Sequence, residues 1–138
     1  MASEIFIDSD IILDLFLNRE PHIVHAQELL NLFDKEEVNL YTSSIIINNV
    51  YYFINKGRNR SIAKSAVKLL ADILKILPVY ADAVELAVDS DFKDFEDALQ
   101  YYTALKQNCD YIITRNTKDY KHSAIPVLTA EQFLRTIL

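Results

Sequence analysis

The sequence predicts an α/β domain with three layers, in which a central, mainly parallel sheet of about five strands lies between helices. Two observations carry this prediction. Short apolar segments of strand type alternate along the chain with longer segments whose apolar residues recur at helical spacing. The chain of 138 residues also has the length of one domain with one core, and we expect a single domain over residues 1–138.

The strands are predicted from short apolar runs that end at polar residues. In chain order they lie at 4–8, 38–43, 76–80, 110–116 and 125–128. The runs at 4–8 and 110–116 are the clearest buried strands. Pro78 restricts the segment 76–80 to a sheet edge or to a short strand, because proline lacks the N–H that a sheet ladder needs.

The helices are predicted from apolar residues three and four apart and from residues that cap helix N-termini. In chain order they begin at Ser9 or Asp10, near Pro21, at Ile45, at Ser61, at Ala83, at Asp94 and at Thr129. Pro21 suits a helix start because the first N–H of a helix has no partner within the helix. The helix from Ile45 is predicted from its spacing in spite of its many β-branched residues.

Composition excludes several classes of protein. Gly57 is the only glycine, which removes the glycine-rich phosphate loops of nucleotide-binding enzymes. Cys109 is the only cysteine, which excludes an internal disulfide and a zinc site built from thiolates. The apolar runs are too short to span a membrane, and no secretory signal is visible, so we expect a cytoplasmic protein without a membrane anchor.

Charge and basic residues leave a nucleic-acid partner open. The net charge of −6 argues against a surface that is basic throughout, but it allows a local basic rim. Basic residues gather in two clusters, namely Lys56, Arg58, Arg60, Lys64 and Lys68, and Arg115, Lys118 and Lys121. Contact with phosphate and simple solvation both remain possible for these clusters.

Acidic residues gather where the predicted fold would bring them together. Asp8 ends the first strand, and Asp94 and Asp97 share one face at the start of a helix. Taken singly, either helix acid is best read as a cap or as a solvated first-turn residue. Together with Asp119, however, the carboxylates would repel one another and raise one another's pKa. Mg²⁺ or Mn²⁺, which prefers oxygen ligands, would relieve this repulsion at the carboxyl edge of the sheet.

Two stretches of this chain resemble PIN domains. IFIDSDIILD, residues 5–14, resembles their opening, in which a strand ends on an Asp followed by Ser or Thr and by Asn or Asp. DFEDALQYYTALKQNCDYIITRNTKDY, residues 94–120, resembles their second half. The resemblance implies a metal-dependent ribonuclease fold that is common among VapC-type toxins of bacterial toxin–antitoxin pairs. It further implies an RNA substrate, a cognate antitoxin as a possible partner, and a homodimer.

By position, the resemblance implies a set of site residues. Asp8 would be the first metal ligand, and Asp97 would be the central carboxylate of the helix. The implied catalytic set is Asp8, Asp94, Asp97, Asn116 and Asp119, and all of these except Asn116 are also implied metal ligands. The resemblance also implies residues that contact the substrate or support the ligands, namely Ser9, Asp10, Asn49, Thr114 and Arg115.

One position departs from the family pattern. PIN nucleases usually carry a Glu in the helix after the second strand, whereas this chain has Asn49 on the expected face. An amide neither neutralises a cation nor acts as a base. A catalytically weakened or inactive PIN module that binds RNA or a protein is therefore the alternative function.

Two further interpretations concern residues outside this pattern. Asp8 and Asp10 also match the Asp-x-Asp of a haloacid-dehalogenase-like phosphatase, but the chain after Thr114 lacks the later strand ending in an acidic pair. Apolar residues among Leu13, Phe16, Leu17 and the tyrosines are candidates for a dimer or antitoxin surface.

Overall fold

The sheet at the centre of the molecule has five parallel strands in the order β3-β2-β1-β4-β5. This computed structural model describes residues 2–137. The strands are β1 (Ser3–Ile7), β2 (Val38–Ser43), β3 (Lys75–Leu77), β4 (Tyr111–Ile113) and β5 (Val127–Leu128). The predicted parallel sheet is confirmed, and β3 lies at an edge and is short, as Pro78 led us to predict. The predicted bounds 76–80 were wrong, because β3 begins at Lys75 and stops before Pro78, which has no N–H for the ladder.

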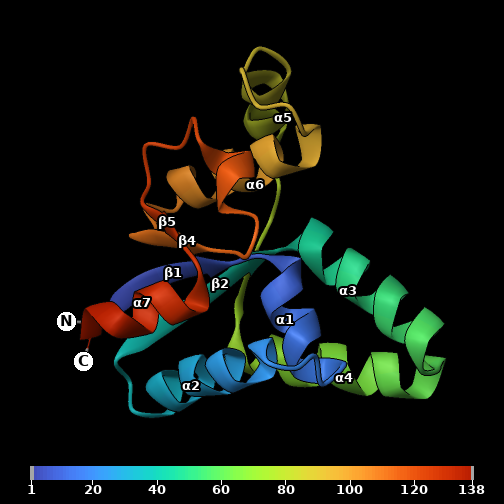
Figure 1. Cartoon of the computed structure of the whole chain (residues 1–138). Coiled ribbons are helices and arrows are strands. Elements are labelled where there is room, and N and C mark those ends of the chain that lie inside the picture. Colours follow the sequence, from blue (N-terminus) through green and yellow to red (C-terminus); the bar gives the residue numbers. More distant parts are fainter. Residues whose placement is uncertain (1, 138) are drawn as a thin grey trace.

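Helices cover both faces of the sheet, which gives the three predicted layers. They are α1 (Ser9–Phe16), α2 (His22–Asp34), α3 (Ser44–Gly57), α4 (Arg60–Ile73), α5 (Ala81–Val88), α6 (Phe95–Lys106) and α7 (Ala130–Ile137), with a short 3₁₀ helix η1 (Thr117–Tyr120). Figure 1 shows α1, α2 and α4 on one side of the sheet, and α5 and α6 on the other.

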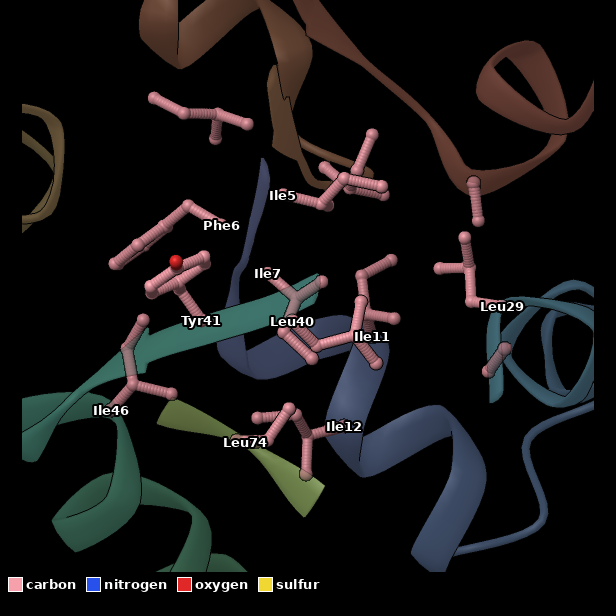
Figure 2. Packing of buried hydrophobic residues seen from close by; sticks show 14 of the residues in the cluster. Ile5, Phe6, Ile7, Ile11, Ile12, Leu29, Leu40, Tyr41, Ile46 and Leu74 are labelled. Carbon is pink, nitrogen blue, oxygen red and sulfur yellow. The ribbon is translucent and has the colours of Figure 1, made fainter. Parts of the chain in front are cut away.

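The core forms around β1 because both faces of this strand are apolar. Ile5 and Phe6 are fully buried. Figure 2 shows Ile7 near Leu40 and Ile11 of α1, whereas Phe6 lies beside Tyr41. Burial on both faces is what a strand inside a parallel sheet requires, and it explains the unbroken apolar run before Asp8.

The strand order places a switch point between β1 and β4. From β1 the chain proceeds to β2 and β3 on one side, and it then crosses to β4 and β5 on the other. Ile7 is in register with Ile113, and the Asp8 N–H donates to the carbonyl oxygen of Ile113 at 3.0 Å. Crevices at such switch points are the usual ligand sites of open parallel sheets. Asp8 and Thr114 therefore leave the sheet side by side at this point.

Two predicted helix caps were wrong by a few residues. Asp8, and not Ser9 or Asp10, is the N-cap of α1, since its backbone is extended and its side chain accepts the Ser9 N–H. Asn59, and not Ser61, caps α4 through the Ile62 N–H. In both cases the helix begins at the first residue after an extended backbone, and only the fold determines where that residue lies.

The surface differs in part from the prediction. Leu13 is 4% exposed and belongs to the core, so it cannot contribute to a dimer or antitoxin surface. Phe16 and Leu17 also pack against the core, whereas Tyr52 is 57% exposed. Among the described residues, no helix is long and apolar enough to cross a membrane.

Candidate active site

Asp8 is the centre of the site because β1 delivers it to the switch point. Its side chain is 8% exposed. Its Oδ1 accepts the Ser9 N–H at 2.8 Å, and its Oδ2 lies 3.0 Å from the hydroxyl of Thr114, which is fully buried at the end of β4. Two neighbouring strand ends thus orient one carboxylate, as the sequence predicted for parallel strands.

Asp97 is brought to Asp8 by a residue that the sequence interpretation did not single out. The hydroxyl of Tyr120 lies 3.2 Å from Asp8 Oδ2 and 3.4 Å from Asp97 Oδ1. Tyr120 is 2% exposed, and burial together with the charges of Asp8 and Asp97 raises its pKa, so the hydroxyl keeps its proton at neutral pH. The hydroxyl has one proton to offer to the two carboxylates and carries no net charge. It therefore does not neutralise the pair.

The other three predicted carboxylates act electrostatically on Asp97. Burial, followed by the charges of Asp8, Asp94 and Asp119, raises the pKa of Asp97 to about 7. Burial also raises the pKa of Asp8, against the hydrogen bonds from the Ser9 N–H, Thr114 and Tyr120. Mutual repulsion of this kind is the state that a bound cation relieves.

Asp94 and Asp119, the other two predicted carboxylates, lie in different local structures. Asp94 is the N-cap of α6, where its Oδ1 accepts the Asp97 N–H at 3.0 Å. The helix cap that the sequence predicted for this residue taken singly is therefore present. Asp119 lies in η1 and is exposed. Asn116, also exposed, donates its backbone N–H to the Thr114 hydroxyl at 3.1 Å. The ligand roles of these residues remain predictions.

Asp10 and Arg115 connect α1 to the chain that follows β4, next to the site. Asp10 Oδ2 accepts the Arg115 N–H at 2.8 Å, and burial and the charge of Asp8 raise the pKa of Asp10 to about 6. The Arg115 guanidinium forms a bidentate ion pair with Asp14, which is 1% exposed. This pairing commits Arg115 to α1, so the structure favours a supporting role over a substrate contact.

Glu96 is a second acidic residue that the sequence interpretation left out. The Asn49 side-chain amide of α3 donates to Glu96 Oε1 at the N-terminus of α6. The charge of Glu96 also contributes to raising the pKa of Asp8, although burial is the main cause. Glu96 thus stands near the position from which the expected glutamate of α3 is missing. Only its place in the DFEDAL motif, next to Asp97, could have indicated it.

The donor set fits one hard divalent cation. Among residues 2–137, no three His, Cys, Asp or Glu side chains lie close enough together to form a metal cluster. Mg²⁺, however, usually takes one or two carboxylates and completes its shell with water and substrate phosphates. Asp8 and Asp97 supply two carboxylates that converge on one hydroxyl and repel each other. Such a pair meets the requirement.

Comparison with known proteins places this arrangement in a family. Residues 4–118 match the model of the PIN domain. Ribonuclease VapC1 of Aquifex aeolicus (strain VF5) is 34% identical over 137 residues, which cover 96% of this chain and 94% of that protein. The chain therefore belongs to the PIN-domain family. It is related to a ribonuclease of the VapC type.

Solved structures show the same fold. One chain of a toxin–antitoxin complex from Klebsiella pneumoniae is 26% identical with a TM-score of 0.68, covering 91% of this chain and 96% of that one. VapBC2 from Rickettsia felis, bound to a DNA fragment from its promoter, has a TM-score of 0.68 at 16% identity, with the same coverage. The sequence-based assignment to PIN domains is thus confirmed.

Proposed function

We propose that this protein is an Mg²⁺- or Mn²⁺-dependent endoribonuclease and the toxin component of a toxin–antitoxin pair. The observation that carries the proposal is the convergence of Asp8 and Asp97 on the Tyr120 hydroxyl at the switch point. The relationship to ribonuclease VapC1 of Aquifex aeolicus supports the choice of RNA as substrate. Hydrolysis of a phosphodiester is the reaction that a hard cation on two carboxylates suits best.

Each residue has a defined task in this mechanism. Asp8 and Asp97 would hold the cation, which when bound polarises the phosphodiester and activates water. Asp94 and Asp119 add negative charge around Asp97 and are the further proposed ligands. Thr114 and the Ser9 N–H keep the Asp8 carboxylate in one orientation. Asp10, through the Arg115 N–H, holds the chain that leaves β4.

Cleavage assays with purified protein test the proposal. The wild type should cleave RNA in the presence of Mn²⁺ and lose this activity in EDTA, because the proposed reaction needs the cation to polarise the phosphodiester and to activate water. Asp97→Asn should reduce the rate by at least about a hundredfold, since it removes one of the two converging charges. Asp72→Asn, at an exposed acid of α4, is the matched control and should cleave like the wild type.

Two results would contradict the proposal. Cleavage that resists EDTA would exclude the metal-dependent reaction. Equal cleavage by the wild type and by Asp97→Asn would point to a contaminating nuclease or to another site. Either result removes the assigned mechanism, while the family membership, which rests on the sequence relationship, is unaffected.

The alternative is a PIN module with weakened or lost activity that binds RNA or a protein. Asn49 at the position of the usual glutamate is the observation that favours it. Calorimetry with Mn²⁺ separates the two functions. Metal binding with RNA turnover supports the nuclease, whereas RNA binding without turnover in saturating Mn²⁺ supports the inactive module.

An antitoxin and a second copy of this chain are the proposed partners. The toxin–antitoxin complex from Klebsiella pneumoniae supports an antitoxin partner for this chain. Exposed apolar side chains on α3 and α4, including Tyr52, Phe53 and Leu69, are available for such contacts. The homodimer and the cytoplasmic location stay predictions. Light scattering of the purified chain at several concentrations measures the oligomeric state directly.

A further inference from the structure

We infer that Glu96 of α6 supplies the carboxylate that PIN domains usually carry on α3, and that Asn49 holds it in place. The inference deepens the proposed function and rests on it. It assigns a role to Glu96, and it explains how a chain with Asn49 can keep a carboxylate next to α3.

The contact between α3 and α6 is the first observation. The Asn49 amide N–H donates to Glu96 Oε1 across 47 positions of sequence. Glu96 and Asp97 are consecutive residues at the start of α6, so their side chains leave the helix about 100° apart. Asp97 is directed to Tyr120, and Glu96 is directed to α3. The first turn of α6 thus carries two carboxylates, of which Asp97 contacts Tyr120 and Glu96 contacts α3.

The charge at Asp8 is the second observation. Glu96 is close enough to Asp8 for its negative charge to contribute to the raised pKa of Asp8, after the larger effect of burial. Glu96 is itself exposed, but the Asn49 amide holds its carboxylate against α3, one residue from Asp97 in the sequence. Glu96 is therefore part of the electrostatic environment of the proposed cation.

The chemistry of the pair explains how Asn49 can hold Glu96. An amide N–H binds one oxygen of the Glu96 carboxylate and leaves the other oxygen free to accept. A glutamate at position 49 would instead repel Glu96. The Asn49–Glu96 pair carries one negative charge, the same as a glutamate at position 49 beside a neutral residue at 96. In this chain the carboxylate lies on α6 and the amide on α3.

Calorimetric titration with Mn²⁺ alone, without RNA, tests the exchange. Glu96→Gln keeps a carbonyl that can accept from Asn49 but removes the charge, and it should weaken Mn²⁺ binding by at least about tenfold. The double variant Asn49→Glu/Glu96→Gln restores an acid on α3 and should recover most of the wild-type affinity. Glu85→Gln, at an exposed acid of α5, is the control and should bind Mn²⁺ as the wild type does.

Each outcome decides the inference. Wild-type affinity in Glu96→Gln would overturn it and leave the proposed function standing. Equal loss in Glu96→Gln and in the double variant would overturn the exchange between helices. Absence of both Mn²⁺ binding and RNA cleavage in the wild type would overturn the proposed function, and the inference with it. Thermal melting in EDTA verifies that every variant is folded.

Discussion

Tyr120 shows how one side chain can hold two like charges together before a cation arrives. Its hydroxyl lies within 3.4 Å of both Asp8 Oδ2 and Asp97 Oδ1, but it can donate only one proton. Burial, and after it the charges of Asp8, Asp94 and Asp119, raises the pKa of Asp97 to about 7. At neutral pH the site therefore stores repulsion, which destabilises the folded chain and favours uptake of a cation.

The raised pKa of Asp97 should make the free energy of unfolding depend on pH. Asp97 has a pKa of about 7 in the folded chain against an ordinary value of 3.8, so between these values the folded chain binds more protons than the unfolded chain. Its contribution to the free energy of unfolding is therefore fully present below about pH 4 and is lost as pH rises through 7. Asp97→Asn removes this loss. In EDTA, the variant should be more stable than the wild type at pH 8 by about 1 kcal/mol, a figure reduced for solvent screening of a partly exposed group.

Urea unfolding at pH 5 and pH 8 tests this prediction. The stability gap between Asp97→Asn and the wild type should widen with pH, whereas Asp72→Asn should show a gap that does not change. A gap that narrows as pH rises would contradict the assigned repulsion. The outcome also matters for function, because a variant that loses activity while gaining stability is typical of residues kept for chemistry.

At the scale of elements, an ion pair fastens α1 to the chain that leaves β4. Asp14 Oδ1 and Oδ2 accept from Arg115 Nη2 and Nε, each at 2.9 Å. The two partners differ in exposure, since the Asp14 side chain is 1% exposed and that of Arg115 is 33% exposed. Arg115 can reach water when its partner is removed, and Asp14 cannot. The penalty for breaking the pair is therefore unequal.

Substitutions on the two sides of this pair should differ in cost. Arg115→Met leaves the buried charge of Asp14, for which Arg19, at 3.8 Å, is the remaining ion-pair partner among residues 2–137, and it should lower the free energy of unfolding by about 3 kcal/mol. Asp14→Asn should cost about 1–2 kcal/mol, because Arg115 can be solvated. Urea unfolding measures both. Arg135→Met, which breaks the exposed pair with Glu131, is the control and should change stability by less than about 0.5 kcal/mol. A larger loss in Asp14→Asn than in Arg115→Met would contradict this account.

The way in which the elements pack explains which parts of the fold and of the site the sequence could predict. The strands of the sheet were found because their apolar runs end at polar residues, and Asp8 and Thr114 were placed together because parallel strands end at one edge. Tyr120 and Glu96 were missed because their roles depend on how η1 and α3 approach α6, which no periodicity encodes. The cap of α1 was predicted one or two residues too late for a related reason. Asp8 follows β1, caps α1 and belongs to the candidate site, and the sequence alone does not show these roles together.

At the scale of the whole molecule, charge decides how a polyanion can approach. The chain has a net charge of −6, so RNA is repelled at a distance and must be attracted locally. Lys118 lies in η1, two residues before Tyr120, and is exposed. Lys64 is exposed on α4, which Figure 1 places on the opposite side of the sheet from α6. The two basic clusters therefore differ in their relation to the site.

This separation predicts unequal roles for the two lysines in RNA binding. In an Asp97→Asn background, which keeps the RNA intact, Lys118→Glu should weaken RNA binding by about tenfold at low salt, and less at high salt, because fewer counterions are released. Lys64→Glu makes the same change of net charge and should have a much smaller effect. Fluorescence anisotropy at several salt concentrations gives both the affinity and its salt slope, and Lys118→Glu should reduce the slope by about one. Equal effects of the two variants would mean that RNA responds only to the net charge of the molecule, and not to a basic rim at the site.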